Sequence, residues 1–368
     1  MRLLHSADWQ IGMRAAFLGE RAPLARMARL EAARRVVEIA RRERVDFALV
    51  AGDTFEDNGV QRVTIRETAR ILGEAPCPVY VIPGNHDPAI PGSVWEDVAW
   101  RECSNIHLLL EPRPVAVPGG TLFPCPVRER WSNADPTAWV ASAAKSDGIR
   151  IGMAHGSVEA AAVQDQTHPI PRDAAGRLGL DYLALGHFHS TATYPGGDGA
   201  VRMAYSGTHE TTRFGERDSG NVLIIDIAGR GAPPVISAQR TGGLRWLQLR
   251  AAIGQPGELR ALLEQIEAIS EPERALVECI ATGTLFASEY DVAGRVLEAL
   301  EGRFLYGRGE LGALRREDVP PAWVEQLPEG YLREAARDLL SQSRGEAPNP
   351  VSTAALRDFA RIWEEVGR

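Results

Sequence analysis

Five apolar stretches of this sequence each end in side chains that can bind a metal ion or carry a proton. Each stretch is short and is stopped by glycine, proline or a polar residue, which is typical of a buried strand. Loops after the carboxyl ends of strands gather at one edge of α/β sheets, so residues distant in sequence can meet there. The candidate site residues are Asp8 with Gln10, Asp53, Asn85 with His86, His155, and His187 with His189.

Hard oxygen and nitrogen donors make up this set. Seven of its members, all except His86, are candidate ligands, and none is a cysteine. That composition disfavours a structural zinc site and suits Mn, Mg, Fe or a catalytic Zn. Seven ligands exceed the needs of one ion. Two divalent ions roughly 3.5–4 Å apart, bridged by one carboxylate, would use all seven, and such sites hydrolyse phosphate esters.

Each member of the set also has a purely structural explanation. His187 and His189 stand at alternate positions and could share one face of a strand. Asp53 could cap the helix that follows it, and His155 could be a core histidine. Because every cluster stands at the end of a strand, one metal site explains the pattern better than several unrelated structural roles.

A β-α-β-α-β pattern positions the first three clusters. Apolar runs of strand length alternate with stretches whose apolar residues recur every three or four positions. This order predicts a parallel sheet. The expected strands are residues 2–7, 46–50 and 79–82, the expected helices are 23–43 and 63–73, and later strands at 149–154 and 182–185 carry the other clusters.

Three domains are expected along the chain. Residues 1–241 carry all five clusters, residues 242–319 read as a small α/β domain without a concentrated polar motif, and residues 320–368 read as helical. The last helix has an apolar stripe that either docks on its own domain or receives a partner helix. The small domain is expected to have strands at 246–249, 275–282 and 303–306 and helices at 256–269 and 289–300; the terminal helices are expected at 322–343 and 352–366.

The amino-acid composition argues against several classes of protein. The net charge of −8 argues against a surface coated with positive charge for nucleic acid, although a local basic patch stays compatible with it. No apolar run is long enough to span a bilayer, and the N-terminus enters a strand pattern without a signal peptide. The four cysteines form no CxxC pair, as expected for reduced thiols. These features predict a cytoplasmic protein.

The motifs around these residues resemble those of calcineurin-like metallophosphoesterases. Within that superfamily the chain resembles SbcD-type DNA repair nucleases. The superfamily motifs are Asp8-X-Gln10, Gly52-Asp53, Gly84-Asn85-His86-Asp87, His155-Gly156 and Gly186-His187-Phe188-His189, and the narrower ones are Leu4-His5-Ser6-Ala7-Asp8-Trp9, Tyr205-Ser206-Gly207 and Phe214-Gly215-Glu216. The resemblance covers residues 1 to about 240. It implies an α/β fold, a metallophosphoesterase β-sandwich flanked by helices in four layers, with a small α/β capping domain and C-terminal helices.

The resemblance also implies a division of labour at the site. One metal, with Mn expected first, would be held by Asp8, residue 10, Asp53 and His189, and a second by Asp53, Asn85, His155 and His187. Asp53 would bridge them. An activated hydroxide would attack the phosphorus in line, and His86 would stabilise the developing charge or protonate the leaving oxygen. The expected activity is that of a DNA exonuclease or endonuclease in repair.

Partners are implied by the same resemblance. The α/β unit stands where SbcD-type nucleases carry a DNA-capping domain. The terminal helices stand where such nucleases contact a coiled-coil ATPase of the SbcC type. A homodimer is expected, and no membrane partner is.

Two positions depart from the family pattern. The family usually has His at position 10, and Gln10 is a weaker, neutral donor, so the first site either holds its metal loosely, prefers a harder ion such as Mn or Mg, or lacks this ligand. Three residues after Asp53, SbcD-type nucleases tend to have His and related phosphatases Asp, whereas this chain has Glu56. We predict that the Glu56 side chain hydrogen-bonds His86 and orients its ring.

Two other functions compete with the nuclease. A phosphodiesterase or phosphatase for small molecules is favoured slightly by the acidic pI of about 5.6. A binding or scaffold protein with a decayed site is supported only by Gln10. The extra α/β domain and the terminal helices favour the nuclease, because an enzyme for small substrates needs neither.

Overall fold

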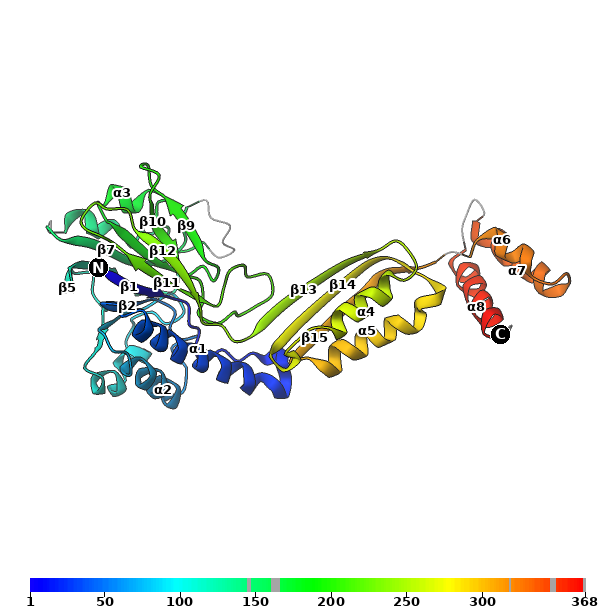
Figure 1. Cartoon of the computed structure of the whole chain (residues 1–368), viewed down its shortest axis with the longest axis horizontal. Helices are drawn as coiled ribbons and strands as arrows, with labels where there is room; N and C mark the ends of the chain where they lie inside the picture. The colour runs from blue at the N-terminus through cyan, green and yellow to red at the C-terminus, as the bar shows by residue number, and fades with distance from the viewer. Residues whose placement is uncertain (144–146, 160–165, 318, 345–348, 367–368) are drawn as a thin grey trace. The chain divides into compact units, whose positions relative to one another are not determined.

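The strand patterns of the sequence fold into two separate large sheets. The computed structural model describes residues 1–143, 147–159, 166–317, 319–344 and 349–366 (Figure 1). Contacts divide the chain into two units, Met1–Trp246 and Leu247–Arg368, called here the first and the second unit.

The first sheet of the first unit contains the expected β-α-β-α-β run. Its order is β12-β11-β1-β2-β3-β4, in which β1 to β4 are parallel and β11 is antiparallel to both β1 and β12. Two helices make the crossovers, as the sequence predicted. The elements are β1 (Arg2–Ser6), α1 (Ala22–Arg42), β2 (Phe47–Ala51), α2 (Arg62–Gly73), β3 (Val79–Ile82), β4 (Ile106–Leu108), β11 (Asn221–Asp226) and β12 (Val235–Arg240), with 3-10 turns at Ala16–Arg21, Val94–Glu96 and Val98–Glu102.

The second sheet of the first unit is also mostly parallel. Its order is β5-β6-β7-β8-β10-β9, with β6, β7, β8 and β10 parallel and the two outer strands antiparallel to their neighbours. Its elements are β5 (Val115–Val117), β6 (Gly120–Cys125), β7 (Ile149–His155), α3 (Ala174–Arg177), β8 (Tyr182–Gly186), β9 (Ala192–Pro195) and β10 (Val201–Tyr205), with a 3-10 turn at Ala138–Ser142.

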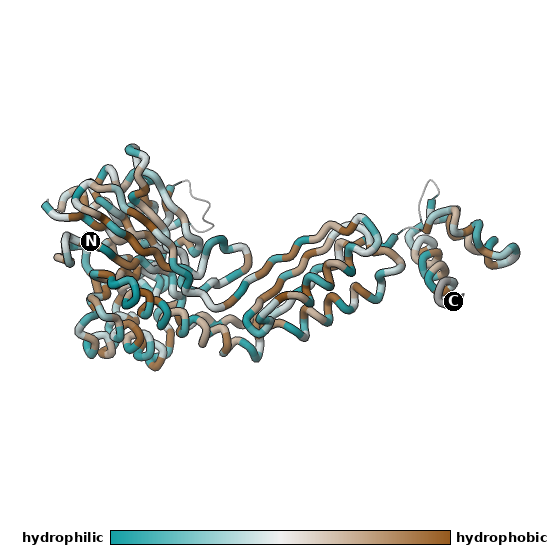
Figure 2. Tube along the Cα trace, in the orientation of Figure 1, coloured by the Kyte–Doolittle hydropathy of each residue, from teal (hydrophilic) through white to brown (hydrophobic). Residues whose placement is uncertain are grey.

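The first unit has four layers, as the resemblance implied. Along β2, Phe47 and Leu49 enter the core between the sheets, whereas Ala48 and Val50 enter the core beneath α1 and α2. A third core lies between the second sheet and α3. This alternation follows from the strand period of two, with both faces of each sheet covered. Figure 2 shows the apolar residues running along these strands.

A buried polar pair joins the two sheets. His5 on β1 is fully buried, with Nδ1 2.8 Å from the hydroxyl of Tyr182 on β8 and Nε2 3.1 Å from the carbonyl oxygen of Leu185. Burial lowers the pKa of His5 to about 3, against a smaller opposing effect of the Leu185 carbonyl. His5 is therefore neutral in the fold at ordinary pH.

This histidine should make the fold sensitive to acid. Unfolded chains protonate the residue near pH 6.5 but the folded protein only near pH 3, so stability present above pH 6.5 is lost as pH falls between these values. Between pH 7 and pH 5 the loss should be about 2 kcal/mol. Urea unfolding should show a smaller loss for His5→Gln, and the same loss as wild type for the exposed control His107→Gln. An equal loss in all three proteins would contradict the assignment.

The second unit contains a three-stranded sheet with two helices on one face. The sheet order is β13-β14-β15, and β14 and β15 are parallel. The elements are β13 (Arg245–Ile253), which starts at the end of the first unit, α4 (Glu258–Glu267), β14 (Ala275–Leu285), α5 (Tyr290–Arg303) and β15 (Tyr306–Arg316), with 3-10 turns at Pro272–Arg274 and Ala287–Glu289. Their order is the predicted one.

The last strand of this sheet corrects a boundary. The apolar pattern predicts this strand at 303–306, but α5 continues to Arg303 and β15 runs from Tyr306 to Arg316. The apolar residues Phe304 and Leu305 are buried, but they lie between the end of α5 and the start of β15. The glycines and charged residues along β15 interrupt the alternation of apolar and polar residues by which a strand is predicted.

The terminal helices also differ from the prediction in one respect. The expected helix 322–343 is two helices, α6 (Pro321–Gln326) and α7 (Tyr331–Arg344), because the segment between them contains Pro328 and Gly330, whose φ is 134°. Most of the apolar stripe of α8 (Pro350–Val366) packs on these two helices, with Leu356, Phe359 and Trp363 in the same cluster. Ile362 and Val366 stay exposed. Among the described residues, no helix has the length and hydropathy to cross a membrane.

Candidate metal centre

The strand ends of the two sheets meet at one place in the first unit. Asp8 follows β1, Asp53 follows β2 and His155 ends β7. One ligand atom from each of these three side chains lies within 4.8 Å of the others, and all three are buried. Two carboxylates and one imidazole, far apart in sequence, therefore form a compact donor group.

Asn85 and two histidines form one side of this centre. The Oδ1 of Asn85 lies 2.9 Å from Nε2 of His155 and 3.0 Å from Nδ1 of His187. The other ring nitrogen of His155 donates to the carbonyl oxygen of Ala51 at 2.9 Å, which turns Nε2 toward Asn85 and toward Asp53 Oδ1, 3.4 Å away. The structure thus brings together the whole second predicted ligand set, Asp53, Asn85, His155 and His187.

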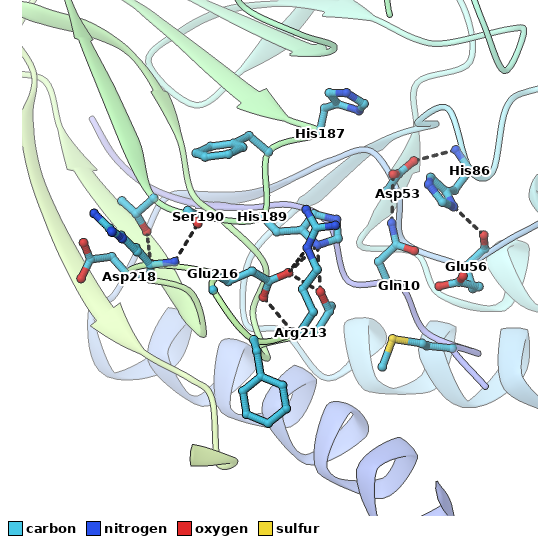
Figure 3. Close-up of a pocket in the computed structure, with 17 residues that line it drawn as sticks. Gln10, Asp53, Glu56, His86, His187, His189, Ser190, Arg213, Glu216 and Asp218 are labelled. Atoms are coloured by element: carbon cyan, nitrogen blue, oxygen red, sulfur yellow. Dashed lines mark hydrogen bonds and ion pairs between the residues drawn. The ribbon is translucent and has the colours of Figure 1, made fainter. Parts of the chain in front are cut away.

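The first predicted set lies beside it. Asp8 accepts the backbone N–H of His187 with both oxygens, at 2.8 and 3.1 Å. The amide of Gln10 donates to Asp53 Oδ2 at 3.0 Å, so Gln10 contacts the predicted bridging carboxylate. His189 turns Nδ1 away from the centre toward Glu216, 2.9 Å away (Figure 3). In this arrangement Nε2 is the nitrogen of His189 left for an ion.

The backbone that presents these residues is unusual. Asp8, Gln10, Asp53 and His187 have φ values of 55°, 45°, 51° and 108°. A positive φ is uncommon for residues other than glycine. Residues with this strained backbone conformation occur often at functional sites, where contacts with the surrounding structure stabilise it. Gly84 allows the loops to approach, because a Cβ there would lie 2.1 Å from Asp53 Oδ1.

Burial and charge pairing shift the pKa values of the centre in different directions. Burial raises the pKa of Asp8 to about 6, although His155 and His189 oppose it. Burial acts in the same sense on Asp53, but His155 outweighs it and lowers the pKa of that carboxyl. Burial acts to lower the pKa of His155, but Asp53 and Asp8 raise it to about 9. An ionised Asp53 thus faces a protonated His155, and a bound cation would replace that proton.

His86 is fixed by contacts to its backbone and its ring. Its N–H donates to Asp53 Oδ1 at 2.8 Å, and its Nδ1 donates to the carbonyl oxygen of Glu56 at 2.9 Å. The predicted bond from the Glu56 side chain is therefore corrected: the loop after β2 brings the main chain of Glu56 against the ring. The Glu56 side chain lines the same pocket, and burial raises its pKa.

Glu216 also lies at the centre, although its place in the sequence predicts no role for it. Its side chain is only 3% exposed, and it contacts His189. Its Oε2 accepts the N–H of Thr212 at 2.8 Å, and the Thr212 hydroxyl donates to Oε1. Burial acts to raise the pKa of Glu216, but His189 and Thr212 lower it, so the carboxylate is ionised. The one sequence signal was the Phe214-Gly215-Glu216 motif of the resemblance.

A buried arginine holds the loop that carries Asp8 and Gln10. Arg29 of α1 is 2% exposed, and its Nε donates to the carbonyl oxygen of Trp9 at 3.0 Å. Its Nη1 donates to the carbonyl oxygen of Glu210 at 2.9 Å. Arg29 therefore joins two loops behind the centre. No sequence signal separates it from the other arginines of an arginine-rich helix.

A pocket of about 990 Å³ opens onto the centre. Its floor includes predicted site residues, and one wall is the segment from Thr212 to Asp218. The donor set fits divalent cations, because it offers carboxylate, amide and imidazole atoms at short mutual distances and no thiolate among the described residues. The residues lining the pocket from the predicted set are Gln10, Asp53, Glu56, His86, His187 and His189.

The chain is similar to several known proteins. The sequence model of the calcineurin-like phosphoesterases matches residues 1–191. The uncharacterized metallophosphoesterase YhaO of Bacillus subtilis (strain 168) is 25% identical over 248 residues, which are 64% of this chain and 58% of YhaO. The chain thus spans less than two thirds of that relative's length. The crystal structure of TT1561 of Thermus thermophilus matches with a TM-score of 0.46 and 12% identity, over 65% of this chain and 98% of TT1561.

Proposed function

This chain belongs to the calcineurin-like phosphoesterase family, and on that premise we propose that it is a metal-dependent nuclease that hydrolyses phosphodiester bonds in DNA. The family implies metal-dependent hydrolysis of phosphate esters. The observation that carries the proposal is the meeting of Asp8, Asp53, Asn85 and His155 beneath an open pocket. The volume of about 990 Å³ is more than a single phosphate group needs and suits a larger substrate.

Two ions would be held in this proposal by the two sets that meet at Asp53. Asp8, Asp53 and His189, with Gln10 beside them, would hold one, and Asp53, Asn85, His155 and His187 the other. We propose Mn as the native metal, because Gln10 replaces a softer imidazole by an amide. Bound divalent ions polarise the phosphoryl oxygens and make water a nucleophile at neutral pH.

The protein's own part in the reaction is positioning and proton transfer. The Ala51 carbonyl and Glu216 orient the rings of His155 and His189 from behind. The backbone of His86 is tied to Asp53, and its Nδ1 is occupied by the Glu56 carbonyl, so Nε2 is the ring nitrogen left to meet a substrate oxygen. In the proposal His86 stabilises the developing charge on the phosphoryl group or protonates the leaving oxygen.

The other parts of the proposal concern partners. We propose that the α/β part of the second unit acts as a DNA cap. We also propose that the terminal helices bind a coiled-coil ATPase of the SbcC type, and that the chain acts as a cytoplasmic homodimer. The exposed Ile362 and Val366 on α8 are compatible with a partner helix.

One assay separates this proposal from its alternatives. Purified full-length protein is incubated with Mn²⁺ and either linear DNA or bis(4-nitrophenyl) phosphate, with EDTA as the control. Cleavage of both substrates supports the nuclease. Cleavage of the small diester alone would replace it by a small-molecule phosphodiesterase, and cleavage of neither would favour a protein with a decayed site.

Gln10 gives a prediction about metal affinity. Gln10→His adds an imidazole donor beside Asp53, and histidine tolerates the positive φ of this position better than most residues. The dissociation constant for Mn²⁺, measured by titration calorimetry, should fall by roughly tenfold, the equivalent of about 1.4 kcal/mol. Gln61→His, at the exposed start of α2, is the matched control. An unchanged affinity would mean that position 10 does not contribute a ligand.

A further inference from the structure

The wall of the pocket formed by residues 212–218 carries two exposed arginines. Arg213 and Arg217 are its only cationic side chains among the described residues apart from histidines. The side chain of Arg213 is 66% exposed. In a chain with a net charge of −8, affinity for an anionic substrate has to come from such local positive groups.

Arg213 stands next to a predicted metal ligand. Its Nε lies 3.7 Å from Glu216 Oε1, and that oxygen lies 2.9 Å from Nδ1 of His189 (Figure 3). The Glu216 carboxylate also accepts bonds from the N–H and the hydroxyl of Thr212. The distance of 3.7 Å from Arg213 Nε to Glu216 Oε1 is longer than a hydrogen bond. Glu216 therefore attracts the guanidinium of Arg213 by charge and does not occupy its N–H donors. Those donors stay available to a ligand in the pocket.

Arg217 stands farther along the same segment. Its backbone N–H donates to the Ser190 hydroxyl at 2.9 Å, which anchors the residue. Its guanidinium makes no hydrogen bond or ion pair with any residue that the structure describes. A cation with no partner on a pocket wall is suited to an anionic ligand.

Contacts with the rest of the first unit fix the segment that carries the two arginines. Phe214 packs edge to face against Trp246, with ring centroids 4.9 Å apart and an interplanar angle of 74°. The bond from Arg217 to Ser190 and the bonds from Thr212 to Glu216 fix the two ends. The arginines are therefore presented on a wall that is ordered before a ligand binds, which lowers the entropic cost of binding.

We propose that Arg213 and Arg217 bind phosphates of the nucleic-acid backbone that flank the phosphate being cleaved. The guanidinium fork matches phosphate oxygens, and successive phosphates are the feature that separates a nucleic-acid strand from a small diester. The inference rests on the proposed nuclease function and adds a subsite to it. It makes the wall at residues 212–218 the element that selects polymeric substrates.

The test compares two substrates in the full-length protein with Mn²⁺. For Arg213→Gln/Arg217→Gln, kcat/KM on a short DNA oligonucleotide should fall on the order of tenfold to a hundredfold. The slope of log kcat/KM against log salt should become shallower by roughly 1.5, since each lost phosphate contact removes about 0.7–0.9. The loss on bis(4-nitrophenyl) phosphate should stay within a few-fold. Arg113→Gln, which replaces an exposed arginine outside the pocket lining, should match wild type.

Three outcomes would overturn the inference. Equal losses on both substrates would mean that the arginines serve the metal centre rather than flanking phosphates. Unchanged kinetics on the oligonucleotide would mean that the phosphates bind elsewhere, while the nuclease function would stand. If wild-type protein cleaves the small diester but no oligonucleotide, the proposed function itself fails, and this subsite with it.

Discussion

Changing Asp53 to Asn should lower phosphodiester hydrolysis by on the order of 10³-fold or more. Asn keeps the size of the side chain and an oxygen to accept the His86 N–H, which Asp53 Oδ1 now accepts at 2.8 Å. It loses the charge that holds His155 and that would bridge two cations in our proposal. The expected loss is therefore in kcat and in metal affinity, not in folding alone. Initial rates on DNA and on bis(4-nitrophenyl) phosphate measure it.

The control for Asp53→Asn is the same substitution of Asp by Asn at a position outside the site. Asp198→Asn removes a half-exposed carboxylate whose partner is Arg202, in a turn of the first unit outside the pocket lining. Its rates should equal those of wild type. Thermal unfolding of both variants shows whether the fold is retained. If Asp53→Asn is folded and keeps more than a tenth of the activity on both substrates, the metal centre is not the catalytic site.

Changing Glu216 to Ala should weaken metal binding by roughly 10–100-fold, the usual cost of losing the partner that orients a ligating histidine. Glu216 is the ionised group behind His189, and it is held by two bonds from Thr212. Without it, His189 loses the contact to Nδ1 that leaves Nε2 as the ring nitrogen available to an ion. Glu216→Gln keeps an oxygen in reach of Nδ1, so it should recover part of the loss. Titration calorimetry with Mn²⁺ measures affinity independently of turnover.

Stability and positioning can be separated for Glu216. Glu111→Ala removes an exposed carboxylate outside the pocket lining and should leave Mn²⁺ affinity unchanged. If Glu216→Ala melts at a lower temperature but binds Mn²⁺ as wild type does, Glu216 supports the loop and does not position His189. A graded series, wild type above Gln above Ala in affinity, is the result that the geometry predicts.

Much of the architecture followed from local patterns. The β-α-β-α-β run and the strands that carry the five clusters lie where apolar periodicity placed them. Boundaries failed where the local signal was mixed. Phe304 and Leu305 have the apolar pattern of a strand but lie between α5 and β15. Between α6 and α7, Pro328 and Gly330 interrupt a stretch whose pattern otherwise predicts one continuous helix. Both errors concern the ends of elements, which are the least reliable part of a prediction from sequence.

The candidate site residues could also be chosen from the sequence. Asp8, Asp53, Asn85 and His155 have the right donor types, and each stands at or just after the end of a strand, so their chemistry and their place at strand ends needed no structure. The distances between these residues, in contrast, could be known only from the structure. The residues come from two different sheets, and only the packing of those sheets brings Asp8, Asp53 and His155 within 4.8 Å.

The roles of the supporting residues depended on the tertiary structure entirely. Glu56 contacts His86 through its carbonyl and not its carboxylate, Glu216 reaches His189 from a later loop, and Arg29 reaches Trp9 from a helix. A side chain that supports a ligand has no spacing rule relative to it, because any element that passes nearby can supply the contact. The sequence alone therefore determined which residues have the chemistry of metal ligands, and that they stand at the carboxyl ends of strands. The fold decided which of them meet and what holds them in place.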